Sequence, residues 1–409
     1  MPFVTKFPVA TFPVQSVRAT YPALDDGHAY LDGAAGTQVP QSVIDAIVSA
    51  YRTGIGNGGG AFEASHRADD IVAACRAAVA DLVGGLPDGV ILGPNMTTLT
   101  YRLAGALALG WGPGDEVVVS RLDHDANVRP WIQLATRAGA TIRWAEVDPA
   151  TGELPVEQYT NLIGERTRLV AVTAASNVLG TVPDVAAITA LAHAAGALTY
   201  VDGVHATAHG PVDIAQLGAD FYATSAYKWS GPHIGAVIAD PALLETIRPD
   251  KLASSPDTVP ERFERGTSPF ADLAGVTAAV NHLATMVPGT GTRRERLLTS
   301  LTAAEAYEQE LFAVLIAGLE AMPHVTLYGK PARRTATAYF TVAGRTPREV
   351  AEALAARRVN VWNGHNYAWE LTGALGIRDS GGAVRVGLVH YNDHSDVDRL
   401  LKAVTRLEE

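Results

Sequence analysis

Apolar segments that end in turn residues alternate with helical segments through the middle of the chain. The apolar segments, in order, are residues 89–93, 116–120, 141–147, 168–174, 197–202 and 220–225. Between most of them lie segments of helical periodicity, such as residues 98–109, 128–138 and 185–195. Buried strands separated by helices of about 10–15 residues are typical of βαβ units, so we predict an α/β fold with a mainly parallel sheet. Residues 234–239 follow the last strand too closely for a crossover helix, so they should pair with it in the antiparallel direction.

The pattern changes after the proline- and glycine-rich segment at residues 288–292. The helices predicted beyond it cover residues 296–321, 347–357 and 394–407, and the strands cover residues 325–328, 337–342, 359–362 and 384–389. Thr346 and Glu349 form a capping box with Pro347 at the first helical position, which marks the start of the middle helix. We therefore predict three parts, which are an N-terminal arm at residues 1–25, a large domain at residues 26–288 and a small C-terminal α/β domain at residues 289–409.

Composition and charge narrow the class of protein. The 409 residues are 47% hydrophobic and 18% charged, an ordinary balance for a soluble globular protein. A net charge of −11 disfavours binding to nucleic acid or to an anionic membrane surface. No segment approaches about 18 uninterrupted apolar residues, and the N-terminus lacks the pattern of a signal peptide. The single cysteine, Cys75, excludes an internal disulfide and a multi-cysteine metal centre, so we predict a cytoplasmic protein without a metal site.

A glycine-rich segment at residues 54–59 matches the dinucleotide pattern G-x-G-x-x-G. That pattern binds a dinucleotide where a strand precedes it and a helix opens on it. Residues 42–51, which precede it here, are instead predicted to be helical. We therefore interpret the segment as a loop that exposes its backbone, and Asn57 within it is a candidate substrate contact.

A carboxylate and a lysine stand at the ends of neighbouring predicted strands. Asp202 ends the strand at residues 197–202, and Lys228 follows the strand at residues 220–225. Ligands of open α/β sheets bind at the carboxyl ends of strands, where these two side chains can converge. Pyridoxal phosphate requires a lysine that forms a Schiff base and an aspartate that holds a protonated pyridine nitrogen. Taken singly, each residue is equally well explained as a surface lysine or as a carboxylate that caps a turn.

Several segments, in the same order along the chain, resemble class V aminotransferases of the cysteine desulfurase-like group. They are residues 30–36 (YLDGAAG), 95–98 (NMTT), 123–131 (DHDANVRPW), 176–181 (SNVLGT), 201–205 (VDGVH) with 225–228 (SAYK), 263–267 (FERGT) and 384–388 (VRVGL). The resemblance covers nearly the whole chain. It implies the type I fold of pyridoxal phosphate-dependent transferases, pyridoxal phosphate as cofactor, an amino acid as substrate, and a homodimer with shared active sites.

The resemblance also implies a role for each matched polar residue. Lys228 forms the Schiff base and moves protons at the substrate's α-carbon, while Asp202 holds the pyridine nitrogen. Arg385 binds the substrate's α-carboxylate. His205 replaces the glutamine that the family usually places near the phenolic oxygen. The residues that hold the cofactor are then Thr97, Thr98, His124, Asn177, Asp202, His205, Ser225 and Lys228, with Thr267 contributed by the partner subunit.

Two departures from the family pattern lie beside the cofactor and the carboxylate site. Desulfurases usually have two consecutive histidines, of which the second stacks on the pyridine ring, where this chain has His124 and Asp125. Asp125 cannot stack as an aromatic ring does, so we expect His124 to take this place. Trp362 matches the position of a second arginine in many desulfurases, and we predict that it contacts substrate.

The third departure concerns the nucleophile of desulfurases. Tyr367 occupies the position of their catalytic cysteine, in a loop that also contains His365, and both are candidate substrate contacts. Cys75 lies in a helical segment far along the chain, where a small core residue is the better interpretation. A mechanism that stores sulfur on a cysteine is therefore not expected.

The reaction is less well defined by the sequence than the cofactor is. We favour a C–S lyase that eliminates a thiol from a sulfur-containing amino acid or an S-conjugate, with Lys228, His124 and Asp202 as catalytic residues. Elimination needs no cysteine, because a thiol is itself a good leaving group. Transamination, epimerisation and decarboxylation of an amino acid remain alternatives, and a non-catalytic protein that binds pyridoxal phosphate is a more remote one.

Overall fold

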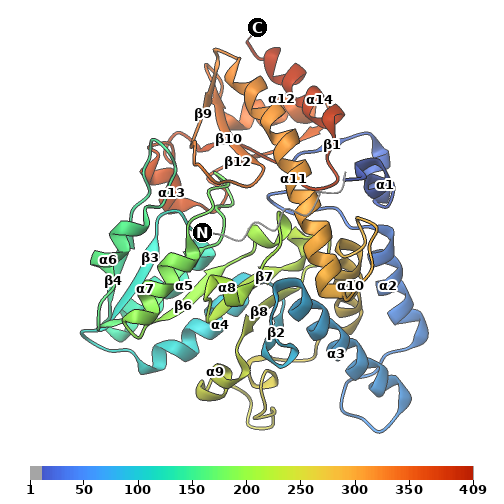
Figure 1. Cartoon of the computed structure of the whole chain (residues 1–409), viewed down its shortest axis with the longest axis vertical. Coiled ribbons are helices and arrows are strands. Elements are labelled where there is room, and N and C mark those ends of the chain that lie inside the picture. Colours follow the sequence, from blue (N-terminus) through green and yellow to red (C-terminus); the bar gives the residue numbers. More distant parts are fainter. Residues whose placement is uncertain (1–11, 409) are drawn as a thin grey trace.

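The computed structural model describes residues 12–408, so residues 1–11 of the predicted N-terminal arm lie outside the described residues. Two sheets of different size stand one above the other, and the long helix α11 (Arg293–Glu320) runs past both (Figure 1). The other α-helices are α1 (Val14–Arg18), α2 (Gln41–Thr53), α3 (Glu63–Val83), α4 (Met96–Leu107), α5 (Arg129–Ala138), α6 (Tyr159–Leu162), α7 (Val185–Ala194), α8 (Ile214–Leu217), α9 (Pro241–Thr246), α10 (Phe270–Leu283), α12 (Pro347–Ala355), α13 (Trp369–Ala374) and α14 (His394–Thr405).

The larger sheet has seven strands in the order β2-β8-β7-β6-β5-β3-β4. They are β2 (Val90–Gly93), β3 (Glu116–Ser120), β4 (Thr141–Ala145), β5 (Thr167–Thr173), β6 (Leu198–Asp202), β7 (Phe221–Ser225) and β8 (Gly235–Ala239). From β4 to β7 the neighbours pair in parallel, and β8 is antiparallel to both β7 and β2. The predicted parallel sheet and its antiparallel strand are therefore confirmed.

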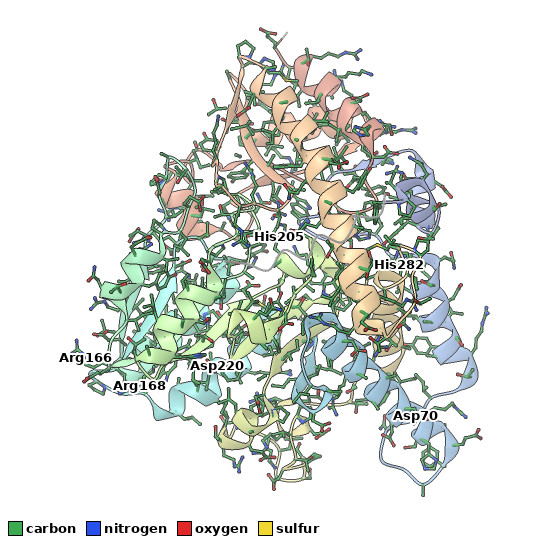
Figure 2. The ribbon with its side chains drawn as sticks, in the orientation of Figure 1. Asp70, Arg166, Arg168, His205, Asp220 and His282 are labelled. Carbon is green, nitrogen blue, oxygen red and sulfur yellow. The ribbon has the colours of Figure 1, made fainter. Side chains whose placement is uncertain are left out.

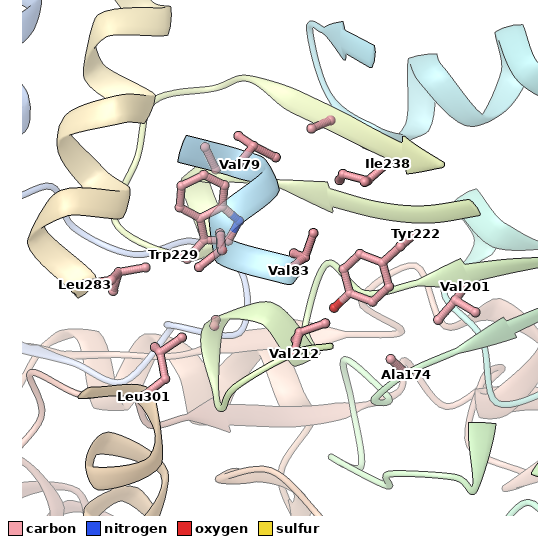
Figure 3. Close-up of a cluster of buried hydrophobic side chains, with 14 of the residues drawn as sticks. Val79, Val83, Ala174, Val201, Val212, Tyr222, Trp229, Ile238, Leu283 and Leu301 are labelled. Atoms are coloured by element: carbon pink, nitrogen blue, oxygen red, sulfur yellow. The ribbon is translucent and has the colours of Figure 1, made fainter. Parts of the chain in front are cut away.

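Alternation of apolar side chains explains why this sheet is covered on both faces. Val118 packs into one core cluster, and its neighbours Val117 and Val119 pack into a second cluster on the other face. Successive side chains of a strand point to opposite faces, so a continuous apolar run needs helices on both sides. Figure 3 shows the first cluster, in which Val79 and Val83 of α3 lie close to Tyr222 and Trp229.

The smaller sheet has four strands in the order β12-β13-β10-β9, all antiparallel. They are β9 (Val325–Leu327), β10 (Thr337–Val342), β12 (Trp362–Gly364) and β13 (Ala383–Gly387). A short parallel pair joins β1 (Ala29–Tyr30) to β11 (Val359–Asn360), and Ala29 and Leu31 belong to the core of this part. Residues 29–31 thus pack with the C-terminal part of the chain, while the boundaries of the predicted domains stay a prediction.

Helix starts follow local capping signals. The predicted capping box at Thr346 and Glu349 is present, and α12 begins directly after it. The helix α11 begins at Arg293, three residues before the predicted start, because Thr292 and Glu295 form a second capping box. The glycine-rich segment at residues 54–59 connects α2 to α3 with no strand before it, so the dinucleotide pattern is rejected as predicted.

Candidate active site

A cavity of about 40 Å³ lies at the carboxyl ends of the central strands. Asp202 ends β6, Lys228 follows β7, and His124 and Asn177 follow β3 and β5. Met96 and Thr97, at the start of α4, close the cavity on one side. His205 also lines it, and Figure 2 shows this residue near the centre of the molecule, between the two sheets. Since parallel strands bring their carboxyl ends to one edge, residues from four separate turns meet here.

Lys228 is a buried amine rather than a surface cation. Its Nζ donates a hydrogen bond to the carbonyl oxygen of Ala34, and only 9% of the residue is exposed. Burial, and then the positive charge of Arg385, lower the pKa of Lys228 to about 7, against the opposing effect of Asp202. A substantial fraction of this amine is therefore neutral near neutral pH, as attack on an aldehyde requires.

Two carboxylates of this region are buried: Asp202, which ends β6, and Asp123, which lies in the turn after β3. Oδ1 of Asp202 accepts a hydrogen bond from the Val204 amide at 2.9 Å, and burial raises the pKa of Asp202 to about 6. Asp123 accepts hydrogen bonds from Ser120 and Asn127, and burial raises its pKa to about 8. A cation bound beside Asp202 would favour its ionised form, which suits a protonated pyridine nitrogen. Asp123 was not predicted as a site residue, although it lies within the matched segment 123–131.

The start of α4 suits a phosphate. Asn95 caps this helix, and its side chain accepts a hydrogen bond from the Thr98 amide at 2.8 Å. The hydroxyl of Ser225 accepts one from the Met96 amide at 3.0 Å, so Ser225 lies directly at the helix terminus. Amide groups and the helix dipole at such a terminus favour an anion. Thr97 lines the inner cavity, while Thr98 lines the larger cleft outside it.

Asn177 and His205 form the wall beside this helix. The Nδ2 group of Asn177 donates to the Asn366 carbonyl at 2.9 Å, while its buried Oδ1 has no partner among residues 12–408. That oxygen can accept a hydrogen bond from a group bound in the cavity. Nε2 of His205 lies 3.0 Å from the hydroxyls of both Thr335 and Thr337, two contacts that the sequence did not predict.

His124 and Asp125 differ in where their side chains lie. Nδ1 of His124 accepts a hydrogen bond from the Ala126 amide at 3.0 Å, and its ring lines the inner cavity. Burial, and then the charges of Lys228 and Arg385, lower the pKa of His124 to about 3, so the ring is neutral. Asp125 accepts a hydrogen bond from Arg129 at 2.7 Å and lines only the outer cleft. The placement is compatible with stacking by His124, which stays a prediction.

A cleft of about 950 Å³ opens outward from the inner cavity. Arg385 on β13 lies at its base and donates from Nη1 to the Asn177 carbonyl at 2.9 Å. Burial lowers the pKa of Arg385 to about 10, which leaves the guanidinium charged at neutral pH. Trp362, His365 and Tyr367 line the same cleft as Arg385, so the structure brings these predicted substrate contacts to one cleft.

Two predicted site residues lie elsewhere in this chain. Thr267 lines a cavity of about 190 Å³ with Arg102 and Arg265, which shares Pro94 and His233 with the outer cleft but is not lined by Lys228. Asn57 lies in the loop between α2 and α3, where its carbonyl accepts a hydrogen bond from the Ser65 hydroxyl at 2.6 Å. Neither residue is among those that line the inner cavity or the outer cleft, so their predicted contacts stay predictions.

The one thiol of the chain lies in the core. Cys75 is fully buried in α3 and belongs to the cluster that contains Val79 and Val83. Burial, and then the negative charge of Glu264, raise the pKa of the Cys75 thiol to about 12. A thiolate is the reactive form, so this thiol is neither accessible nor activated.

No helix among residues 12–408 is long and apolar enough to cross a membrane.

Comparison with known proteins gives consistent results for nearly the whole chain. The family model "Aminotransferase class-V" matches residues 29–400. An uncharacterised protein of Mycobacterium tuberculosis is 39% identical over 399 residues, which cover 97% of this chain and 99% of that protein. A probable cysteine desulfurase of Pseudomonas aeruginosa is 35% identical over 410 residues, 95% of this chain and 97% of that protein. The crystal structure of the cysteine desulfurase CsdA from Escherichia coli superposes with a TM-score of 0.86 at 29% identity, covering 98% of this chain and 99% of that one.

Proposed function

Because this chain belongs to the class V aminotransferase family of pyridoxal phosphate-dependent enzymes, we propose that it is a C–S lyase acting on a sulfur-containing amino acid or an S-conjugate. The proposal rests on the contrast between a lysine amine in the cavity and a thiol in the core. The buried amine of Lys228 lies in the inner cavity, whereas the one thiol of the chain is buried in α3 with a raised pKa. Elimination uses such an amine and needs no protein thiol.

The groups that line the inner cavity and the adjoining cleft suit the chemistry of the cofactor. When bound, pyridoxal phosphate supplies an aldehyde for the amine and a ring that accepts electrons from the α-carbon. Lys228 Nζ would hold the aldehyde, and Asp202 would hold the proton on the ring nitrogen. Ser225 and the start of α4 would hold the phosphate, as the amide groups at that helix terminus allow. The free Oδ1 of Asn177 would accept a hydrogen bond from the bound group.

The remaining residues would handle the substrate. Arg385 would bind the α-carboxylate through its guanidinium fork, at the base of the cleft. Lys228, once released from the cofactor, would take the proton from the α-carbon. The Cβ–S bond then breaks, its electron pair leaves on sulfur, and the thiolate takes up a proton. After hydrolysis the products are a thiol, ammonia and a 2-oxo acid. His124 would cover the bound cofactor from the side of the cleft.

We also propose a homodimer in which Thr267 reaches the phosphate of the partner's site, and a cytoplasmic location. Thr267 lies outside the inner cavity of its own chain, which supports a contribution to another site. Complementation tests the dimer. A mixture of Lys228→Ala and Thr267→Ala chains would contain heterodimers with one intact site, because one chain supplies Lys228 and the other Thr267. Recovery of activity on mixing is expected, and activity that stays at the level of the separate variants would contradict a shared site.

The reaction itself is tested by product analysis. The holoenzyme is incubated with a panel of amino acids and S-conjugates, and thiol, ammonia and 2-oxo acid are measured separately. The proposal expects thiol and 2-oxo acid in equal amounts from at least one S-substituted amino acid. Amino transfer to an added 2-oxo acid, loss of CO₂, or inversion at the α-carbon without thiol release would instead assign one of the alternatives. A cofactor spectrum that no amino acid perturbs would indicate a non-catalytic protein.

A further inference from the structure

Exposed aromatic rings gather on one wall of the outer cleft. Trp362 is 51% exposed and Tyr367 is 68% exposed, and both line this cleft together with His365. Several other large aromatic side chains of residues 12–408, such as Trp131 and Trp229, are fully buried. Apolar surface that faces water at the mouth of a cavity is characteristic of a ligand site rather than of a core.

The segment that carries Tyr367 is held in place rather than free to swing. The Asp125 amide donates to the Tyr367 carbonyl at 2.7 Å, and Asn177 Nδ2 donates to the Asn366 carbonyl at 2.9 Å. Asn366 and Tyr367 have φ angles of 51° and 57°, a left-handed conformation that non-glycine residues adopt only at a cost in free energy. Contacts on both sides of the cavity thus impose this conformation, and the Tyr367 ring stacks on His124 with centroids 5.4 Å apart.

Trp362 is placed beside the expected carboxylate site. On the antiparallel pair β12–β13, Trp362 lies directly opposite Arg385. Directly opposite residues of an antiparallel pair have side chains on the same face, with Cβ atoms about 5 Å apart. An amino acid whose carboxylate binds Arg385 would therefore occupy the cleft that Trp362 and Tyr367 line.

The charges that line the cleft leave no partner for a charged substrate side chain. Asp125 and Arg129 form an ion pair, and Arg129 also contacts Glu370. Lys228 and Arg385 are committed to the cofactor and to the α-carboxylate under the proposed function. Under that assignment none of the Asp, Lys and Arg side chains that line the cleft is left without a partner, and Trp362 and Tyr367 add exposed aromatic rings to its lining.

We propose that Trp362 and Tyr367 form an aromatic clamp that selects amino acids with an uncharged, ring-bearing side chain. This inference deepens the proposed function and rests on it for the place of the carboxylate. If the reaction is the proposed elimination, the substrates are cysteine conjugates with an aromatic group on sulfur.

Binding of two amino acids that lack a leaving group on the β-carbon tests the clamp separately from elimination. The probes are 2-amino-4-phenylbutanoate, which carries a phenyl ring but no sulfur, and 2-aminobutanoate, which lacks the ring. Their dissociation constants are measured from the cofactor absorbance of the holoenzyme. We expect the phenyl compound to bind at least about tenfold more tightly. Contact between aromatic rings, together with burial of the phenyl surface, increases binding affinity by about this factor. Equal affinity, or tighter binding of 2-aminobutanoate, would overturn the clamp.

Variants assign the preference to the two rings. Trp362→Ala and Tyr367→Ala should each reduce the preference about fivefold while leaving 2-aminobutanoate within about twofold, and Tyr367→Phe should keep the preference. Tyr51→Ala removes a ring that is 69% exposed on α2 and serves as the matched control. A loss of affinity that is equal for both probes would show a structural role and contradict the clamp. If Trp362→Ala does not retain cofactor, Trp362→Leu gives the same comparison.

Thiol release from S-benzylcysteine and S-methylcysteine completes the design. Selective binding of the phenyl probe without any thiol release would support the clamp and reject the elimination. Thiol release from both conjugates at equal kcat/KM, with no binding preference, would support the elimination and reject the clamp. The two proposals therefore fail in different ways.

Discussion

The inner cavity and the outer cleft share a boundary but are built differently. The inner cavity is lined by turns that follow strands of the large parallel sheet, and its side chains are buried. One wall of the outer cleft comes instead from β12 of the smaller sheet and the segment that follows it, and the aromatic side chains of Trp362 and Tyr367 there face water. Ends of buried strands are rigid, whereas a connecting segment tolerates change in sequence more easily. The chemistry common to the family can thus stay fixed while this wall changes the choice of substrate.

Burial has a clear electrostatic consequence in the inner cavity. It lowers the pKa of Lys228 to about 7 and that of His124 to about 3, and it raises the pKa of Asp202 to about 6. Each shift favours the neutral form, as expected where charged groups lose hydration. Burial therefore reduces the charge that these groups carry before the cofactor binds. In the cleft, by contrast, charges are matched by ion pairs such as Asp125–Arg129.

The largest expected effect comes from removal of the amine that distinguishes the inner cavity. Lys228→Ala should reduce turnover by at least about a thousandfold, since it removes both the attachment to cofactor and the base. Lys330→Ala is the matched control, because Lys330 is exposed and pairs with Glu320. Borohydride reduction followed by peptide mapping should place the cofactor on Lys228 in the parent protein. A label on Lys251 or Lys330 would contradict the assignment of the whole site.

The second prediction concerns the pH dependence of cofactor attachment. The neutral amine attacks the aldehyde, and the pKa of Lys228 is lowered to about 7. The attachment rate should therefore rise as pH increases through about 7 and level off above it, whereas an ordinary lysine would still be rising near pH 9. Arg385→Gln removes a positive charge that lowers this pKa, so the midpoint should move to higher pH. Stopped-flow absorbance between pH 6 and about 9.5 measures the midpoint.

Arg129→Gln is the control for this pH profile. Arg129 carries the same charge but is paired with Asp125 and Glu370. Its removal should leave the midpoint within about 0.3 pH units, because the paired charge is already largely compensated. A midpoint above about 9 in the parent protein, or one that Arg385→Gln moves downward, would refute the electrostatic account.

The features of the molecule also differ in how well the sequence predicts them. The strands of the large sheet were predicted because buried apolar runs leave a clear pattern, and Asp202 and Lys228 were placed because each follows such a run. The contacts of His205 with Thr335 and Thr337 were missed, since those residues lie 130 and 132 positions further along the chain. No local pattern encodes a hydrogen bond between distant segments.

Other differences between the prediction and the structure concern the start of a helix, a short strand and a loop. The capping box at Thr292 and Glu295 was readable in the sequence, and it would have placed the start of α11 correctly. β1 has two residues, too few to show a period, so its pairing with β11 could not be predicted. The loop conformation at Asn366 and Tyr367 depends on contacts with Asn177 and Asp125, and neither residue type favours it strongly enough to reveal it.

A smaller effect is expected at His205, the imidazole between the cavity and the smaller sheet. His205→Ala leaves the buried hydroxyls of Thr335 and Thr337 without this partner, which should cost about 1–3 kcal/mol of unfolding free energy. His205→Gln can restore a hydrogen bond, so it should lose less stability and retain cofactor more tightly than His205→Ala. Chemical denaturation and equilibrium dialysis with pyridoxal phosphate measure the two quantities. Equal losses in both variants would contradict a hydrogen-bonding role.

The smallest effect is expected at Cys75, which lies far from both regions in α3. Its thiol is fully buried, and its pKa is raised to about 12, so the native protein should not react with a thiol reagent at pH 8 until it unfolds.

Cys75→Ala removes one sulfur atom from the core and should cost about 1 kcal/mol of stability. Turnover of the true substrate should stay within about threefold of the parent, because no step of the elimination passes through a protein thiol. Tyr367→Phe is the informative partner variant, since loss of its hydroxyl should alter the rate while the ring preference is kept and cofactor remains bound. If Cys75→Ala abolished turnover with fold and cofactor intact, sulfur transfer through a cysteine would have to replace the elimination, and the contrast between the two regions would no longer explain the reaction.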